Sequence, residues 1–289
     1  MRKLAFLLML VVLPHYALAG QSSITEADGE SCMGDDKSRK QTEDAALADA
    51  KRLAIEYTST HVSSTTVVEN FQLKQDLVEA FNRANVKVLN ILDEKWADPA
   101  VSDCYTIRIK AEVVPVDDLM KKVDNTQSMA DPRLPLNVNV WVDSQDQTYE
   151  EGQDVTVYLQ GNKPFYARLI YTDASGNNIQ ILPNQHRSDN YFAGATILEI
   201  PEAKDKFLLT VTPPFGKEKL TLYASTSPLG GISTTKAGGD VYAVNEAPEA
   251  IPAKTRGISI QAVSTEEKAK KQSKVAEFAE SSVEITTKP

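Results

Sequence analysis

The sequence is short of the residues that most often carry out chemistry in proteins. Its 289 residues include three histidines and two cysteines, and beyond the first nineteen residues the histidines are His61 and His186. A metal site needs several histidine, cysteine or carboxylate ligands that converge, and the sequence has neither an H-E-x-x-H nor a C-x-x-C spacing. It also lacks a phosphate-binding P-loop and a dinucleotide-binding glycine pattern. We therefore expect no metal, no cofactor and no enzymatic activity.

Three short strings imitate the S-x-x-K, S-D-N and K-T-G motifs of serine β-lactamases. They are Ser233–Lys236, Ser188–Asn190 and, more loosely, Lys254–Gly257. Their order is wrong, because S-D-N precedes S-x-x-K. The S-x-x-K chemistry needs the serine and the lysine one turn apart at the start of a helix, whereas Ser233 follows a pair of glycines. An unrecognised hydrolase is kept only as a distant alternative.

The chain has no excess of positive charge and no run of lysine and arginine. Lysine and arginine together number 31 against 40 aspartates and glutamates, which gives a formal net charge of −9. Binding to nucleic acid or to anionic lipid depends on an electropositive surface. We therefore expect neither nucleic acid nor an acidic membrane surface as a partner.

The N-terminus has the pattern of a secretory signal peptide. Arg2 and Lys3 precede an apolar run from Leu4 to Leu13, and Ala17-Leu18-Ala19 is typical of a cleavage site before Gly20. The apolar run is too short to span a bilayer as a helix, and no second long apolar run follows. We expect a soluble, exported protein that begins at Gly20 and has no transmembrane anchor after cleavage. The alternative is a buried N-terminal helix.

The two cysteines are Cys32 and Cys104. An even number of cysteines in an exported protein predicts a disulfide bond. The bond would close a loop of about seventy residues and contribute roughly 3–4 kcal/mol through chain entropy. Two free, buried thiols are the alternative.

The first half of the chain predicts an α+β domain over residues 20–116. We expect an extended segment at Gln21–Met33 that forms an edge strand. A capping box formed by Ser38 and Gln41 follows and starts a helix that we expect to reach about His61. A second amphipathic helix and two strands follow, and apolar residues alternate most clearly from Tyr105 to Val113. Two helices on one face of a small sheet are expected.

Four stretches of this half carry a family resemblance: GESCMGDDKSRKQTEDAALADAKRLAIE, VVENFQLKQDLVEAF, VKVLNILDEKW and YTIRIKAEVVP. Together, over about Glu26–Val116, they resemble the N-terminal domain of the flagellar assembly protein FlgT and related small lipoprotein domains of bacterial envelopes. The resemblance implies the bacterial periplasm as the compartment. The chain has no evident copy of the later FlgT domains, so the resemblance does not extend to a flagellar role.

The second half predicts a β-sandwich-like domain over residues 136–289, after a linker at residues 117–135. Short stretches of period-two alternation are separated by turns rich in glycine, proline, asparagine and aspartate. Phe207–Ser225 predicts two strands around the bend at Pro213–Gly216. Ser264 and Glu267 predict the start of a C-terminal helix of about fifteen residues that includes Phe278 and Ala279, and Ser282–Thr287 predicts a closing strand.

Five ordered motifs in this half resemble the bacterial domain of unknown function DUF4384. They lie at Tyr149–Val157, Tyr171–Gly176, Ile181–Asn184, Asp189–Gly194 and Val211–Glu218. The resemblance covers about Leu136–Thr287 and implies a sandwich-like module that accompanies other domains. It implies no activity.

Two functional hypotheses follow. The first is a non-enzymatic periplasmic binding or assembly protein that contacts other envelope proteins. Its candidate contact face is formed by Trp141, Tyr158 and Tyr223, and the alternative is that these aromatic residues pack under the C-terminal helix. The second is a module that binds a small ligand or a glycan through the loop Pro183–Gly194. Its candidate ligand-binding residues are Asn184, His186, Arg187, Asp189 and Asn190.

Overall fold

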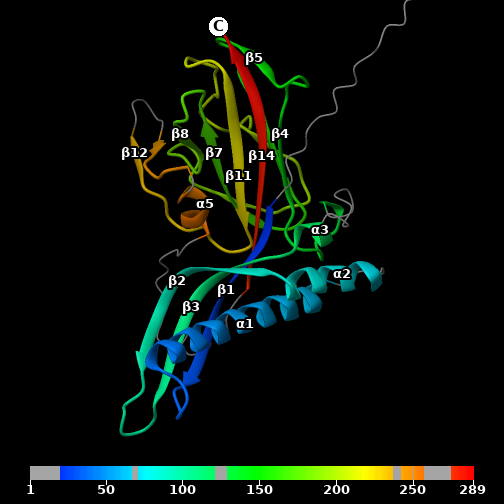
Figure 1. Ribbon diagram of the computed structural model, residues 1–289. Coiled ribbons are helices and arrows are strands. Elements are labelled where there is room, and N and C mark those ends of the chain that lie inside the picture. Colours follow the sequence, from blue (N-terminus) through cyan, green and yellow to red (C-terminus); the bar gives the residue numbers. More distant parts are fainter. Residues whose placement is uncertain (1–19, 67–70, 121–128, 237–241, 249, 257–274) are drawn as a thin grey trace, which may run out of the picture.

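The computed structural model describes residues 20–66, 71–120, 129–236, 242–248, 250–256 and 275–289 (Figure 1). The predicted signal peptide and the predicted start of the C-terminal helix at Ser264 lie outside these residues. No helix in the described part of the chain has the length and apolar character needed to cross a membrane.

The N-terminal module is a three-stranded sheet with two helices on one face, as predicted. Its strand order is β1-β3-β2, and both neighbouring pairs are antiparallel. The elements in chain order are β1 (Gly20–Cys32), α1 (Arg39–Thr65), α2 (Phe71–Asn82), β2 (Asn85–Trp96), β3 (Cys104–Val114) and the short α3 (Asp117–Met120).

The predicted start of α1 is confirmed in detail. Ser38 Oγ accepts a hydrogen bond from the Gln41 N–H, and Gln41 Oε1 accepts one from the Ser38 N–H, which completes the capping box. The helix continues one turn beyond the predicted end at His61 and reaches Thr65. The predicted disulfide between Cys32 and Cys104 is also confirmed, at the point where β1 and β3 pair.

Helix α1 lies directly on the backbone of β1, because small residues meet at their contact. Ala46, Ala50 and Ala54 of the helix are fully buried, and Gly29 is buried opposite them in β1. A Cβ atom at Gly29 would lie 2.8 Å from the Ala50 Cβ and closer still to the Ala46 carbonyl oxygen. The absence of a side chain at Gly29 therefore sets the distance between the helix and the sheet.

Replacing Gly29 by Ala is expected to lower the free energy of unfolding by about 1–3 kcal/mol, because the helix backbone must move away from the sheet. Gly231→Ala is the matched control, since a Cβ atom at Gly231 would meet nothing within 4 Å. Chemical denaturation followed by circular dichroism measures both. Equal stability of the two variants would contradict this account of the contact.

The C-terminal module consists of the remaining strands, arranged as two layers around a hydrophobic core. One layer has the order β12-β13-β8-β7-β11-β14, and the other has the order β10-β6-β4. Its elements in chain order are β4 (Val138–Val142), β5 (Thr148–Glu150), β6 (Val157–Gly161), β7 (Phe165–Thr172), β8 (Asn178–Leu182), β9 (Tyr191–Phe192), β10 (Leu198–Ile200), β11 (Lys217–Ser225), β12 (Thr234–Lys236), β13 (Tyr242–Val244), α5 (Ala250–Thr255) and β14 (Ala276–Lys288). The predicted class, an α+β module followed by a sandwich-like β module, is confirmed.

Two local predictions in this module are wrong. Phe207–Val211 forms no regular strand; it makes only an isolated bridge, between Thr210 and Asp154, although Leu208 points to solvent between partly buried neighbours as the alternation indicated. Phe278 and Ala279 belong to β14 and not to a helix. Both belong to a strand because β14 pairs on each side, and pairing with distant strands is not visible in the local pattern.

Strand β14 joins the two modules into a single sheet. It pairs antiparallel with β11 of the sandwich on one side and with β1 of the N-terminal module on the other. Figure 1 shows β14 in red running from β1, in blue, along β11. The prediction that the first strand lies at an edge is therefore wrong, because β1 lies between β14 and β3.

Candidate functional site

The loop predicted to bind a ligand uses most of its polar groups to hold its own shape. Asn184 Oδ1 accepts hydrogen bonds of 2.8 Å from the N–H groups of His186 and Arg187. Asp189 Oδ1 accepts one from the Tyr191 N–H, and Asn190 Nδ2 donates to the Ala167 carbonyl oxygen on β7. The structure therefore keeps these residues in one loop, but the side chains of Asn184 and Asp189 bond to the backbone of that loop and the side chain of Asn190 bonds to β7.

The guanidinium of Arg187 is also occupied within the protein. It lies 2.8 Å from Asp205 and 2.6 Å from Glu202, and its carbon stands 5.4 Å from the centre of the Phe192 ring. Only about a tenth of the Arg187 side chain is exposed. His186 is exposed beside the Phe207 ring. Anchoring of this loop is thus the role that the geometry gives Arg187.

The three aromatic residues predicted to form one face lie in two different sheets. Trp141 and Tyr158 are cross-strand neighbours on β4 and β6, and their rings stack with centres 5.6 Å apart. Tyr223 lies on β11, is buried, and packs against Phe278 in a cluster with Ile251 of α5. The prediction that all three residues form one face is therefore wrong. Tyr223 packs under a helix, but that helix is α5 and not the predicted C-terminal helix.

The junction between the modules is fixed by a buried carboxylate on one face of the sheet. Glu277 of β14 is 6% exposed. Its Oε1 lies 3.2 Å from His61 Nε2 at the end of α1, and its Oε2 lies 2.9 Å from Lys163 Nζ and accepts a 2.6 Å hydrogen bond from the Leu136 N–H. Burial alone would raise the pKa of Glu277, but the His61 and Lys163 contacts and the Leu136 N–H together lower it below its usual value.

A second charged group fixes the junction on the opposite face. Arg256, at the end of α5, stands 2.6 Å from the buried Glu112 of β3 and 3.3 Å from Glu280 of β14. Ser22 of β1 donates a 2.7 Å hydrogen bond to Glu112. Burial raises the pKa of Glu280, and the nearby Arg256 offsets only part of that effect. Arg256 thus pairs with carboxylates of two strands, β3 and β14, at this point.

Beyond this junction, β14 has a stretch that no strand in the described part of the chain pairs with on one edge. Pairing with β1 ends where Glu280 meets Gly20, and pairing with β5 begins where Thr286 meets Thr148. The five residues Ser281–Ile285 lie between those points, and in the described part of the chain no strand pairs with them on this side. We call Ser281–Ile285 and the space along their unpaired edge the β14 gap.

Backbone hydrogen-bonding groups point into the β14 gap. The Thr286 N–H donates to the Gln147 carbonyl oxygen, on the edge of β14 that faces β5 and the gap. The Thr287 N–H donates to the Gly216 carbonyl oxygen, on the edge that faces β11. The N–H and C=O groups of successive residues in a strand point to alternate edges. This alternation continues along β14, because its register with β11 has no irregularity. The N–H and C=O groups of Ser282 and Glu284 therefore face the gap.

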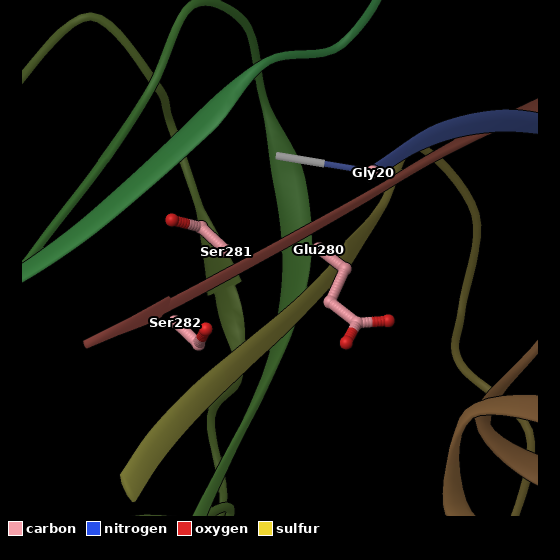
Figure 2. Close-up of a pocket in the computed structure, with 4 residues that line it drawn as sticks. All are labelled: Gly20, Glu280, Ser281 and Ser282. Carbon is pink, nitrogen blue, oxygen red and sulfur yellow. The ribbon is translucent and has the colours of Figure 1, made fainter. Parts of the chain in front are cut away.

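A shallow depression of about 220 Å³ lies at one end of the gap, lined by Gly20, Glu280, Ser281 and Ser282. Figure 2 shows that the side chains of Glu280 and Ser282 lie on one side of the strand and that of Ser281 on the other. Sequence reasoning missed this site. The alternation of Ser282–Thr287 predicted a strand, but nothing in the local pattern indicates which parts of that strand have a partner.

The comparisons with known proteins identify part of the C-terminal module. Residues 148–228 match the family model of a domain of unknown function, DUF4384. The matched DUF4384 segment begins with β5 and ends just after β11, which confirms the predicted resemblance of this half. It includes the loop at residues 184–190 but neither β14 nor the N-terminal module, so the resemblance of that module to FlgT stays a prediction. No curated protein and no solved structure matches the chain.

Proposed function

We propose that this protein is an exported, non-enzymatic binding or assembly protein of the bacterial periplasm that acts through contacts with other envelope proteins. The observation that carries the proposal is the β14 gap. Unpaired strand edges are ready sites for pairing with another chain, because their N–H and C=O groups need partners. Ser281–Ile285 pair with β11 on one side, and their other edge, in the middle of a long sheet, has no strand beside it in the described part of the chain.

The location of the gap supports an assembly role. It adjoins the point where β1 of the N-terminal module meets β14 of the sandwich, so a protein bound there would touch both modules. The Glu277 contacts and the Arg256 contacts hold the modules together on either face of the sheet at that point. A bound partner would therefore meet one rigid surface.

Site-specific photo-crosslinking in the periplasm tests this proposal. A photoreactive residue replaces Ser282, which lines one end of the gap, or Asp28, which is exposed on β1 away from it. Mass spectrometry is expected to find the same envelope proteins in repeated experiments with position 282 and not with position 28. Absence of crosslinked proteins at position 282 would contradict the proposed function, and equal crosslinking at both positions would exclude the gap as the contact.

A further inference from the structure

We infer that the β14 gap takes a short extended segment of a partner protein, which adds to the sheet antiparallel to β14 and in line with β1, with alternating apolar and basic side chains. This inference rests on the proposed function and names the kind of partner. It is carried by the backbone groups that face the gap, by the distance between its two ends, and by the side chains on its two sides.

The backbone requires a polypeptide in extended form. Ser282 and Glu284 each present an N–H and a C=O to the gap, at the spacing of an antiparallel ladder that β1 begins through Gly20 and Glu280. A segment that continued this ladder would pair with Ser282 and Glu284 in the same way. Recognition by added strands obtains affinity from main-chain hydrogen bonds and specificity from alternate side chains.

The ends of the gap limit the length of the segment. Gly20 occupies the neighbouring position at one end and Thr148 at the other, and between them five residues of β14 have no described strand beside them on this edge. A partner strand that remained extended for longer would collide with one of these residues. The site therefore selects a segment of about five residues that turns away or ends at Gly20.

The side chains around the gap define two faces. Val283 and Ile285 are 7% and 4% exposed and point into the sandwich core, so the residues opposite them should be apolar. Glu284 points to solvent on the other face, with Lys219 of β11 opposite it on its paired side. A lysine or arginine in the added segment would lie opposite Glu284 on the gap side and form a cross-strand pair of opposite charges with it.

Synthetic five-residue peptides with the sequence Val-Lys-Val-Lys-Val, acetylated and amidated at their ends, test the inference. In the inferred register the N–H groups of both lysines point to β14, and those of the valines at the second and third apolar positions point away. N-methylation of the lysines is expected to weaken binding at least about tenfold relative to N-methylation of those two valines. NMR titration of the ¹⁵N-labelled full-length mature protein measures binding, and amide hydrogen exchange should slow at Ser282 and Glu284.

A charge-reversal variant gives an independent check. Glu284→Lys is expected to weaken binding of the unmodified peptide by about tenfold or more, whereas Asp28→Lys, on an exposed part of β1, should leave it unchanged. Equal binding of the two methylated peptides, no protection at Ser282 and Glu284, or no binding of the unmodified peptide would each overturn the inference. If envelope proteins crosslink but the peptides show none of these effects, the inference is wrong and the proposed function stands. If the peptide binds as expected but no proteins crosslink, the proposed function is wrong.

Discussion

Replacing Glu277 by Ala is expected to lower the free energy of unfolding by about 3–5 kcal/mol, because removal of one member of a buried ion pair leaves the other charge uncompensated. Lys163, only 13% exposed at its side chain, would lose its 2.9 Å partner. The Leu136 N–H would lose its buried acceptor, and His61 would lose its contact between α1 and β14. Urea denaturation followed by tryptophan fluorescence and circular dichroism measures the change.

Glu284→Ala provides the matched control on the same strand, because its side chain is exposed and an exposed substitution usually changes stability by less than about 0.5 kcal/mol. A loss at Glu277 no larger than at Glu284 would contradict the view that Glu277 connects the modules. The Glu277→Ala variant should also show greater amide exchange at Gln21–Ile24, since these residues pair with β14 beside Glu277.

Glu277 should also make the stability of the protein depend on pH. The pKa of Glu277 is lower in the folded protein than in the unfolded chain, so its contribution to stability is complete above the unfolded pKa of about 4.3 and is lost as the pH falls through the folded value. Stability of the wild-type protein should therefore decrease below about pH 5 more steeply than that of Glu277→Gln. Parallel pH profiles of the two proteins would contradict this assignment.

Removal of the disulfide is the second change with a large expected effect. The bond joins residues 72 apart in sequence, and a loop of that length predicts a loss of about 4 kcal/mol when the unfolded chain gains its full entropy. The double variant Cys32→Ala, Cys104→Ala should show this loss in denaturant titrations. Its stability should not respond to a thiol reductant, whereas reduction of the wild-type protein should reproduce the loss. A wild-type protein that is insensitive to full reduction would contradict the stabilising role of the bond.

The sequence predicted well those features that depend on neighbouring residues. The capping box at Ser38 and the alternation from Tyr105 to Val113 both arise from contacts within a few positions. The disulfide followed from the number of cysteines and the expected compartment. These signals do not depend on where the rest of the chain lies.

The features that the sequence did not predict depend on pairing between distant segments. Gln21–Met33 has the same local pattern whether it lies at an edge or between two strands, and only the register with β14 decides the matter. Phe278 follows a lysine-rich segment that favours a helix, but hydrogen bonds to β1 and β11 stabilise a strand. Glu277 and Arg256 could not be identified because their partners come from segments far apart in the chain.

The pairing of β1 with β14 limits the order in which the parts of the protein can fold. Gly20–Ile24 pair with Ala276–Glu280, so the first described strand obtains its second neighbour only after almost all of the described chain has been synthesised. Contacts of such large sequence separation form slowly, because a long loop must close before they gain any energy. Until then, the β1 edge of a nascent chain is open to other strands, and a binding factor that covers it would favour correct folding.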